Sequence, residues 1–497
     1  MNTSASLLLV GFCLAATTLY TEAASNSAIN NENPSAPVFK RCIIGNGAAT
    51  QAAECTTLQV PMDPGNPDAG KLDLAVARIP ATSAATGDAF TLLAGGPGQS
   101  AIESWPSVSF AFRHIARDHD VILIDQRGTG GSSPLDCPVS NESMTLQLDL
   151  NAEELADATS DCLKGFDMDV RLFTTSIAIQ DLESVRLQLG IPAWNIYGVS
   201  YGTRVAQHYL RRYPKAVRTL ILDAVVPPSA VLGPEIAPLA QRALDNIFIR
   251  CAASADCQQR FPDIASKTAE LLATLKNRPH EVTYEDIGTG QLRTVAFSDQ
   301  HLALTLRLMS YSSQTAALLP SMLHEAISND NFAPLARQAD LQASSLDRSL
   351  ATGMHHTVVC TEDVPFIDWR TDPEKSENTY LGGDLLDALK ASCSVWPVGK
   401  LDADFHDPLV SSTPTLILSG ANDPITPPDY GNAAVKSLAN ARHIINPDRG
   451  HMQAPYGCMP ALMAKFIANA DPAALSLKCL ERLGVSPFFV DANGPLP

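Results

Sequence analysis

A serine between two closely spaced glycines constrains this chain more than any other feature. The pentapeptide at 198–202 (GVSYG) lies between an apolar, extended run at 194–197 and a run of helical character at 203–213. A turn this tight between a strand and a helix has no room for a Cβ at either flank, so glycine is needed there. The order strand, sharp turn, helix predicts that the Ser200 hydroxyl stands clear of the backbone at the start of a helix.

Short apolar runs alternate with helical stretches through the first half of the chain. The runs at 89–93, 121–124 and 219–226 are bounded by turn residues, which is typical of buried parallel strands. Residues 178–189 carry apolar side chains at helical spacing and are followed by Gly190, a helix stop signal. This alternation predicts an α/β protein with a mostly parallel sheet flanked by helices.

The pattern changes midway along the chain. Residues 229–405 are mostly helical in character, with a strand-like interlude near 281–296. A buried-strand pattern then returns at 413–420. We therefore expect residues 25–228 and 406–497 to form one core, interrupted by a mainly helical cap at 229–405.

The N-terminus has the character of a secretory signal. Residues 6–20 form an apolar run, and Ala23 and Ala24 supply small residues near a plausible cleavage point. We predict that residues 1–24 are a signal peptide and that the mature protein is secreted or periplasmic. No Lys or Arg precedes the run, and a membrane anchor is the alternative, although the run is short for a span.

Cysteine usage agrees with export. The chain has 11 cysteines, and without Cys13 of the predicted signal ten remain. An even number in an exported chain suggests disulfides. Pairing nearest neighbours gives 42–55, 137–162, 251–257, 360–393 and 458–479. Ten cysteines allow on the order of a thousand pairings, so the connectivity stays open at this point.

Charge argues against two classes of partner. The chain has 35 basic and 53 acidic residues, a formal net charge of −18, which disfavours nucleic acid and anionic membranes as main partners. After the predicted signal, no apolar run is long enough for stable membrane insertion. No C-x-x-C motif and no cysteine pair with histidines at zinc spacing occurs, so no metal and no organic cofactor is expected.

A serine hydroxyl needs a general base to become a nucleophile, and the base needs an orienting carboxylate. After the predicted cap, Asp423 follows one apolar strand and His451 follows a second. Loops at the carboxyl ends of parallel strands are where catalytic groups gather. We therefore predict Ser200, Asp423 and His451 as the catalytic residues.

Three other side chains compete for these roles. Asp429 lies past two prolines, where a helix is expected to begin. His443 lies on a predicted strand, and His406 precedes the strand that leads to Asp423. None of the three has the loop context of Asp423 or His451.

Two backbone amides are expected to stabilise the oxyanion. One belongs to Tyr201, directly after the nucleophile. The other should come from the glycine-rich loop at 94–100, where we favour Gly96 and keep Gly95 as the alternative. Each such donor lowers the barrier by roughly 3–4 kcal/mol. The loop lacks the Gly-Lys-Ser/Thr ending of a phosphate-binding loop.

These motifs together resemble those of a known family. The loop at 95–98 (GGPG), the segment 125–128 (DQRG), the serine pentapeptide, and the late Asp423 and His451 are similar to those of serine aminopeptidases of the α/β-hydrolase fold. Within that fold the chain resembles the proline iminopeptidase and secreted tripeptidyl aminopeptidase group. The resemblance implies an α/β-hydrolase fold with a large helical cap inserted in the core.

The resemblance covers about 90–228 and 410–485. The part with Cys458 and Cys479 is similar to the C-terminal segment of the tripeptidyl aminopeptidase branch. Ala94 departs from the histidine that is usual in proline iminopeptidases, so the resemblance does not imply strict prolyl specificity.

The resemblance also implies an activity and a partner. Such enzymes release residues or short peptides from free peptide N-termini through an acyl-enzyme, and cap carboxylates bind the substrate ammonium group. The candidates in this chain are Glu362, Asp363 and Glu235. A buried carboxylate is costly, so either member of the 362–363 pair would need a cation if buried. An esterase or lipase with the same triad is the alternative, and the oligomeric state stays open.

Overall fold

A large β-sheet organises the part of the chain that can be described. The computed structural model describes residues 37–47, 49–83, 85, 87–137, 151–491 and 493–495. The predicted signal peptide at 1–24 lies outside the described residues. The described residues from Pro37 onward belong to one unit of the structure.

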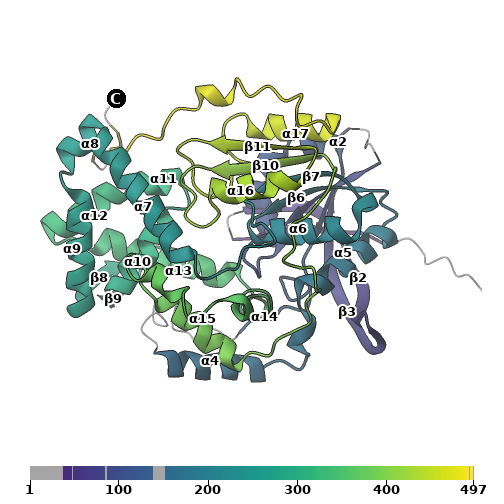
Figure 1. The fold of residues 1–497 in the computed structure, drawn as a ribbon, viewed down its shortest axis with the longest axis horizontal. Coiled ribbons are helices and arrows are strands. Elements are labelled where there is room, and N and C mark those ends of the chain that lie inside the picture. The colour runs from purple at the N-terminus through teal and green to yellow at the C-terminus, as the bar shows by residue number, and fades with distance from the viewer. Residues whose placement is uncertain are drawn as a thin grey trace, which may run out of the picture. The chain divides into compact units, whose positions relative to one another are not determined.

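Within the described ranges, the sheet has nine strands in the order β1-β2-β3-β5-β4-β6-β7-β10-β11 (Figure 1). The strands are β1 Lys40–Asn46, β2 Ala49–Asp63, β3 Asn66–Ile79, β4 Ala89–Leu93, β5 Val121–Ile124, β6 Trp194–Val199, β7 Val217–Asp223, β10 Thr415–Gly420 and β11 Ala441–Asn446.

The sheet has a parallel part and an antiparallel part. Strands β5, β4, β6, β7, β10 and β11 are parallel to one another, as the apolar runs predict. Strands β1, β2 and β3 extend the sheet antiparallel beyond β5. The carboxyl ends of the parallel strands meet at one edge of the sheet, which is where the predicted catalytic residues follow β6, β10 and β11.

Both faces of the parallel part are buried. On β7, Leu220 and Leu222 belong to one hydrophobic cluster, and Ile221 between them belongs to another. Neighbouring side chains of a strand point to opposite faces, so each cluster covers one face. Helices α5 and α6 contribute to the first cluster, and α1, α2 and α17 to the second. Their bounds are α5 Thr175–Gln188, α6 Tyr201–Arg212, α1 Ala101–Val108, α2 Ile115–Asp118 and α17 Met459–Asn469.

Most helices of the predicted cap pack around a third hydrophobic cluster, with the small sheet of β8 and β9. Figure 1 shows α7 to α13 gathered beside the large sheet. These elements are α7 Ile236–Ala253, α8 Ala255–Arg260, α9 Ile264–Asn277, β8 His280–Glu285, β9 Leu292–Phe297, α10 Asp299–Met309, α11 Ser313–Ala316, α12 Leu319–Asn329 and α13 Ala333–Ser349.

Three further segments join the core to the predicted cap. Helix α14 (Thr352–Glu362) packs into the first cluster of the core through Met354 and Val358. Helix α4 (Ala152–Lys164), from the first part of the chain, lies against α15 (Asp384–Val395), and the Thr159 hydroxyl donates to Ser392 Oγ at 3.3 Å. The segment near the C-terminus places Phe488 in the third cluster. The predicted boundaries between 25–228, 229–405 and 406–497 therefore do not separate independently packed domains.

The predicted nearest-neighbour pairing of the cysteines is confirmed. Five disulfides join Cys42–Cys55, Cys137–Cys162, Cys251–Cys257, Cys360–Cys393 and Cys458–Cys479. Each pair is local in sequence, and the largest separation is 33 residues. A set of this size is typical of proteins that fold in an oxidising compartment.

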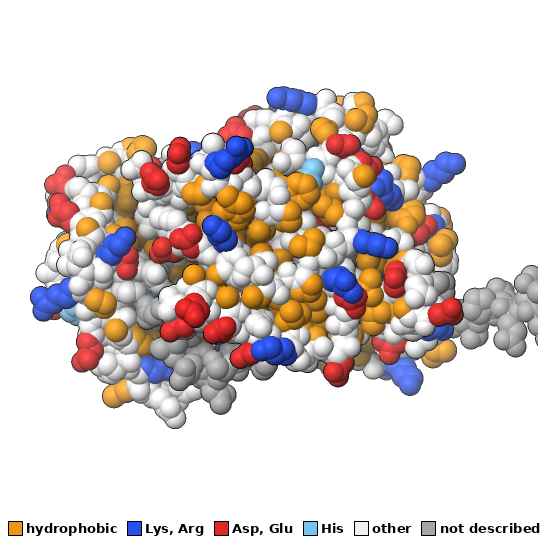
Figure 2. Space-filling model, turned by 60° about the horizontal axis from the view of Figure 1, so that its bottom comes forward, with side chains coloured by type: hydrophobic (Ala, Val, Ile, Leu, Met, Phe, Trp, Pro, Cys, Tyr) orange, Lys and Arg blue, Asp and Glu red, His pale blue; other side chains and the backbone are white. Residues whose placement is uncertain are grey.

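None of the helices in the described ranges is both long and apolar enough to cross a membrane. On the face seen in Figure 2, acidic and basic side chains are interspersed, with hydrophobic side chains between them. The negative net charge is not gathered into one patch on that face.

Candidate active site

The serine pentapeptide forms the predicted turn between β6 and α6. Ser200 has φ 54° and ψ −125°, a backbone conformation that side chains larger than glycine adopt at a cost of about 1–3 kcal/mol. A Cβ on Gly202 would collide with the carbonyl oxygen of Leu93, and one on Gly198 would collide with the backbone of Gly202. Close approach of the backbone therefore explains both glycines, and the strained turn exposes Ser200 at the N-terminus of α6.

Backbone amides surround the Ser200 side chain. Tyr201 is the first residue of α6, so its N–H has no acceptor within the helix. The loop after β4 lies beside the turn, because a Cβ built on Gly95 would be 3.3 Å from Ser200 Cβ. Gly96 has φ 105°, and within the described ranges no hydrogen bond is made by its N–H. The structure thus places Gly95 beside Ser200, and Gly96 and Tyr201 line the same pocket as Ser200.

Asp423 is held in a turn just after β10. Its Oδ1 accepts hydrogen bonds from the N–H groups of Ile425 and Thr426, both at 2.9 Å. Its Oδ2 accepts from the Thr426 hydroxyl at 2.7 Å and lies 2.8 Å from His451 Nδ1. Since an ionised carboxylate only accepts, His451 Nδ1 donates, which leaves Nε2 as the free acceptor of the ring. Thr426 was missed in the sequence analysis, because its role depends on this turn.

The charge around His451 favours the protonated ring. Burial disfavours the imidazolium, but the Asp423 carboxylate opposes this by its charge and its hydrogen bond, and Asp223 adds a smaller effect. The net result raises the pKa of His451 above its ordinary value. A base of raised pKa accepts a proton readily from a nearby hydroxyl.

The loop that carries His451 is fixed against the predicted cap. The His451 N–H donates to the carbonyl oxygen of Tyr311 at 2.7 Å, and the two rings meet edge to face at 5.1 Å between centroids. A Cβ on Gly450 would collide with the same Tyr311 carbonyl, which explains the glycine before the histidine. The Arg449 guanidinium donates to the hydroxyls of Ser313 and Ser486.

Asp223, at the end of β7, connects the nucleophile to the histidine loop. Its carbonyl oxygen accepts from the Ser200 N–H at 3.0 Å. Its carboxylate accepts from the N–H groups of Gln453 and Ala454 and from the Tyr197 hydroxyl, each at 2.8 Å. Burial raises the pKa of Asp223 to about 6 despite these hydrogen bonds. Among the described residues, the His451 ring has hydrogen-bond contacts with Asp423 and Thr426 and none with Ser200 Oγ.

The three candidate cap carboxylates occupy different environments. Glu362 is fully buried and accepts from the Thr175 N–H at 2.7 Å and the Thr175 hydroxyl at 2.9 Å. Asp363 is 1% exposed and accepts two hydrogen bonds from the Arg204 guanidinium, at 3.0 and 3.1 Å. The side chain of Glu235 is 44% exposed and lies 2.5 Å from Lys375 Nζ. Arg204, one turn after Ser200, is thus the cation that the buried pair requires.

Arg204 and Glu362 hold their charges under opposing influences. Burial disfavours the charged guanidinium, yet Asp363 and Glu362 outweigh it and raise the pKa of Arg204. Burial raises the pKa of Glu362 to about 7, and Arg204 only partly offsets this. Glu362 therefore changes charge near neutral pH, next to a guanidinium that does not.

Ser200 opens into a pocket between the core and the predicted cap. Gly96, Tyr201 and Arg204 line it on the core side, and Asp363 and Glu235 bring carboxylates to it. Glu362 does not line this pocket, because it lies behind Asp363 against Thr175. The remaining lining is mostly apolar: Pro97, Val226, Ala230, Val231, Leu232, Gly233, Ile236, Leu239, Ile425, Thr426 and Tyr430. We call this the acyl pocket below.

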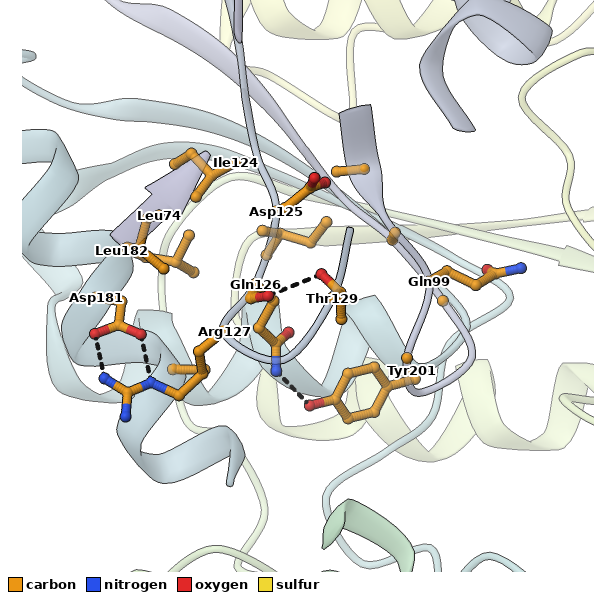
Figure 3. A pocket seen from close by; sticks show the side chains of 16 residues that line it. Leu74, Gln99, Ile124, Asp125, Gln126, Arg127, Thr129, Asp181, Leu182 and Tyr201 are labelled. Carbon is orange, nitrogen blue, oxygen red and sulfur yellow. Dashed lines mark hydrogen bonds and ion pairs between the residues drawn. The ribbon is translucent and has the colours of Figure 1, made fainter. Parts of the chain in front are cut away.

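Figure 3 shows the small cavity behind Tyr201, on the core side of the turn. Arg127 is fully buried there, and two hydrogen bonds join its guanidinium to Asp181, at 2.6 and 2.7 Å. The Gln126 amide donates to the Tyr201 hydroxyl at 3.0 Å. Arg127 therefore ties loops together, and Gln126 fixes the residue that follows the nucleophile.

The competing residues lie in other contacts. His443 Nε2 is 2.9 Å from Ser419 Oγ, and its Nδ1 is 3.1 Å from Asn432. His406 Nδ1 is 2.9 Å from the carbonyl oxygen of Pro228. Asp429 is exposed and forms an ion pair with Arg242 at 3.3 Å. None of these contacts involves Ser200 or Asp423.

A serine on a strained turn between a strand and a helix, followed by an aspartate–histidine pair on later loops of the same sheet edge, defines a serine hydrolase of the α/β-hydrolase fold. The chain has the α/β-hydrolase fold. Residues 88–282 match the model of the alpha/beta hydrolase fold, and residues 379–479 match that of TAP-like proteins.

Curated relatives include peptidases and an esterase. The chain is 27% identical over 409 residues to serine protease Hip1 of Mycobacterium tuberculosis, covering 76% of this chain and 77% of the relative. It is 31% identical over 197 residues to tripeptidyl aminopeptidase of Streptomyces coelicolor, covering 35% and 36%. It is also 31% identical over 281 residues to carboxylesterase B of Mycobacterium tuberculosis, covering 51% and 53%.

Proposed function

We propose that this serine hydrolase is an exported aminopeptidase that releases residues or short peptides from free peptide N-termini. The observation that carries the proposal is the acyl pocket, where Ser200 shares a mostly apolar space with the carboxylates of Glu235 and Asp363. A substrate whose amino terminus is charged finds negative side chains there, at the acyl side of the bond to be cut. The peptidases among the curated relatives support the same reading.

We assign the catalytic roles as part of this proposal. Ser200 Oγ attacks the peptide carbonyl carbon and gives its proton to His451 Nε2, while Asp423 holds the ring by Nδ1. The amides of Tyr201 and Gly96 donate to the oxyanion. His451 then returns the proton to the leaving amine as the C–N bond breaks. Water, deprotonated by the same ring, hydrolyses the acyl-enzyme and regenerates the Ser200 hydroxyl.

Of the three candidate carboxylates, Glu235 has the position best suited to an ammonium group. Both Asp363 oxygens already accept from Arg204, and Oδ1 also accepts from the Leu232 N–H at 2.8 Å. The side chain of Glu235 is partly exposed and its partner Lys375 is exposed, so their ion pair is weak and a substrate can displace it. Asp363 contributes negative charge to the wall, and Glu362 supports Arg204 from behind.

Blocking the amine of the substrate tests the proposal. We expect kcat/KM for a peptide amide to fall about fivefold on N-acetylation, because an ion pair with a partly exposed carboxylate is worth about 1 kcal/mol. Glu235→Gln should shrink that ratio by weakening the free-amine substrate alone. Equal rates on free and acetylated substrates would contradict the aminopeptidase proposal while leaving the serine mechanism intact.

The second candidate is a carboxylic ester hydrolase with the same triad, which the similarity to carboxylesterase B favours. The apolar lining of the acyl pocket would also accept an uncharged acyl chain. The same pair of assays separates the two functions. An esterase should hydrolyse short acyl esters faster than free-amine peptides and should be insensitive to Glu235→Gln.

A further inference from the structure

A second pocket borders the same glycine-rich loop as the acyl pocket, through Ala94, Gly95 and Gln99. Gly95 borders it, and the Cβ that Gly95 lacks would be 3.3 Å from Ser200 Cβ, so the pocket begins beside the nucleophile. The pocket is lined by Leu92, Ala94, Gly95, Gln99, Ser100, Glu103, Ser104, Ser107, Val108, Ala111, Phe112, Tyr197, Val199, Ser345, Arg348, Ser349, Met452, Ala454 and Pro455.

The two pockets border different catalytic loops. Ile425 and Thr426, from the turn of Asp423, line the acyl pocket. Met452 and Ala454, from the loop of His451, line the second pocket. The imidazole must hand its proton to the leaving nitrogen, so the leaving part of a substrate has to lie on the histidine side of the scissile carbonyl.

We propose that the second pocket binds the leaving part of the peptide and accepts an apolar side chain on the first residue after the scissile bond. The inference rests on the proposed peptidase function and adds a substrate preference to it. The interior of the pocket is apolar, with Leu92, Val108, Phe112 and Val199 among its walls. Glu103 and Arg348, of opposite charge, are also in the lining, so no single charge selects the residue.

The pocket acts in only one half of the reaction. During acylation the Ser200 Oγ–carbon bond forms, the carbon–nitrogen bond breaks, and the hydroxyl proton ends on the leaving amine. The leaving peptide then departs, and water takes its place beside His451. Contacts in the second pocket therefore change the rate of acylation and leave the hydrolysis of the acyl-enzyme unchanged.

Narrowing the pocket from two opposite sides tests the inference. Ser107 on α1 and Ser345 on α13 are both exposed, so Ser107→Trp and Ser345→Trp fill the pocket without disturbing the core. Leu341→Trp is the matched control, because Leu341 is 46% exposed on α13, one turn before Ser345, and does not line the pocket.

The substrates share one acyl part and carry either Leu or Gly as the first leaving residue. We expect the wild type and Leu341→Trp to prefer Leu at least about tenfold in kcat/KM, and both pocket variants to lose that preference. Hydrolysis of the common acyl-enzyme, formed from an activated ester, should stay within about twofold.

Three results would overturn the inference. They are a wild type indifferent to Leu against Gly, pocket variants that keep the preference, and a deacylation rate that falls together with acylation. None of these results changes the effect expected from N-acetylation of the substrate. The proposed role of the second pocket can therefore be refuted while the aminopeptidase proposal stands.

Discussion

Ser200 carries the strain of the turn and the proposed covalent chemistry in one residue. We expect Ser200→Ala to lower kcat by roughly a million-fold, as for other serine nucleophiles, because it removes the hydroxyl that we propose forms the acyl-enzyme. The measurement is turnover of an aminoacyl p-nitroanilide, with circular dichroism to show that the fold is kept. Near-normal turnover by the folded variant would refute the mechanism.

The pKa of His451 sets the acid limb of the pH profile. Asp423 raises that pKa above the ordinary value of about 6.5, so the ring stays protonated, and unable to accept from Ser200, up to a higher pH. Activity should therefore fall as pH decreases through a value above about 6.5 in the profile of kcat/KM. Asp423→Asn should lower both the rate and the apparent pKa. A profile flat down to pH 5 would exclude His451 as the base.

The raised pKa of Glu362, the last residue of α14, predicts how the stability of the protein depends on pH. Folding raises the pKa of Glu362 from 4.5 to about 7, so the folded state holds this proton more tightly than the unfolded state. The stabilisation is complete below pH 4.5 and disappears as pH rises through about 7. Glu362→Gln, which cannot ionise, should have a Tm that rises relative to the wild type between pH 5 and 8.

Thr175→Val is a useful companion, because it removes one hydroxyl donor to Glu362 and keeps the carboxyl group. Thr175→Val should lower Tm at pH 5 and at pH 8. The dependence of Tm on the charge of Glu362 should remain. A difference in Tm between Glu362→Gln and wild type that does not change with pH would show that Glu362 keeps one charge state throughout.

Elements buried on both sides were the easiest to predict. The apolar runs at 89–93 and 121–124 became β4 and β5 with the same bounds, since every residue in them is buried. Strands β1 to β3 were not singled out, because exposed residues recur along β2 and dilute its apolar signal. Within the mostly helical stretch 229–405, residues 313–329 form two helices, α11 and α12, with a break before Leu319.

The residues of the candidate site also differ in how well they could be predicted from the sequence. Ser200, Asp423 and His451 could be named because each follows an apolar strand in a recognisable loop. Asp223 and Arg204 could not, since their roles arise from partners far away in sequence, and Thr426 could not, because its contact with Asp423 depends on how the turn folds. Glu362 and Asp363 were found as a pair of acids, but only the folded chain separates the one that lines the acyl pocket from the one behind it.

At the scale of the whole molecule, disulfides connect segments whose packing also matters for the site. Cys360–Cys393 joins α14, which ends at Glu362, to α15. Replacing both cysteines by alanine should lower the free energy of unfolding by about 2–4 kcal/mol, as expected for a closed loop of 33 residues. Urea unfolding under non-reducing conditions measures this.

The matched control is replacement of Cys251 and Cys257, whose loop spans only six residues far from Glu362. If that pair cost as much stability and activity as the long one, the link between α14 and α15 would have no special importance.

The hydrogen bond from the His451 amide to the Tyr311 carbonyl would limit how the proposed peptide substrates enter the site. Tyr311 follows α10. A rigid movement of α10 away from the core would therefore break the hydrogen bond between His451 and Tyr311. Each such movement would release the loop that holds His451 in position for the next turnover. We therefore expect substrates to enter from the side while the predicted cap stays in place. This would limit the enzyme to unfolded chain ends.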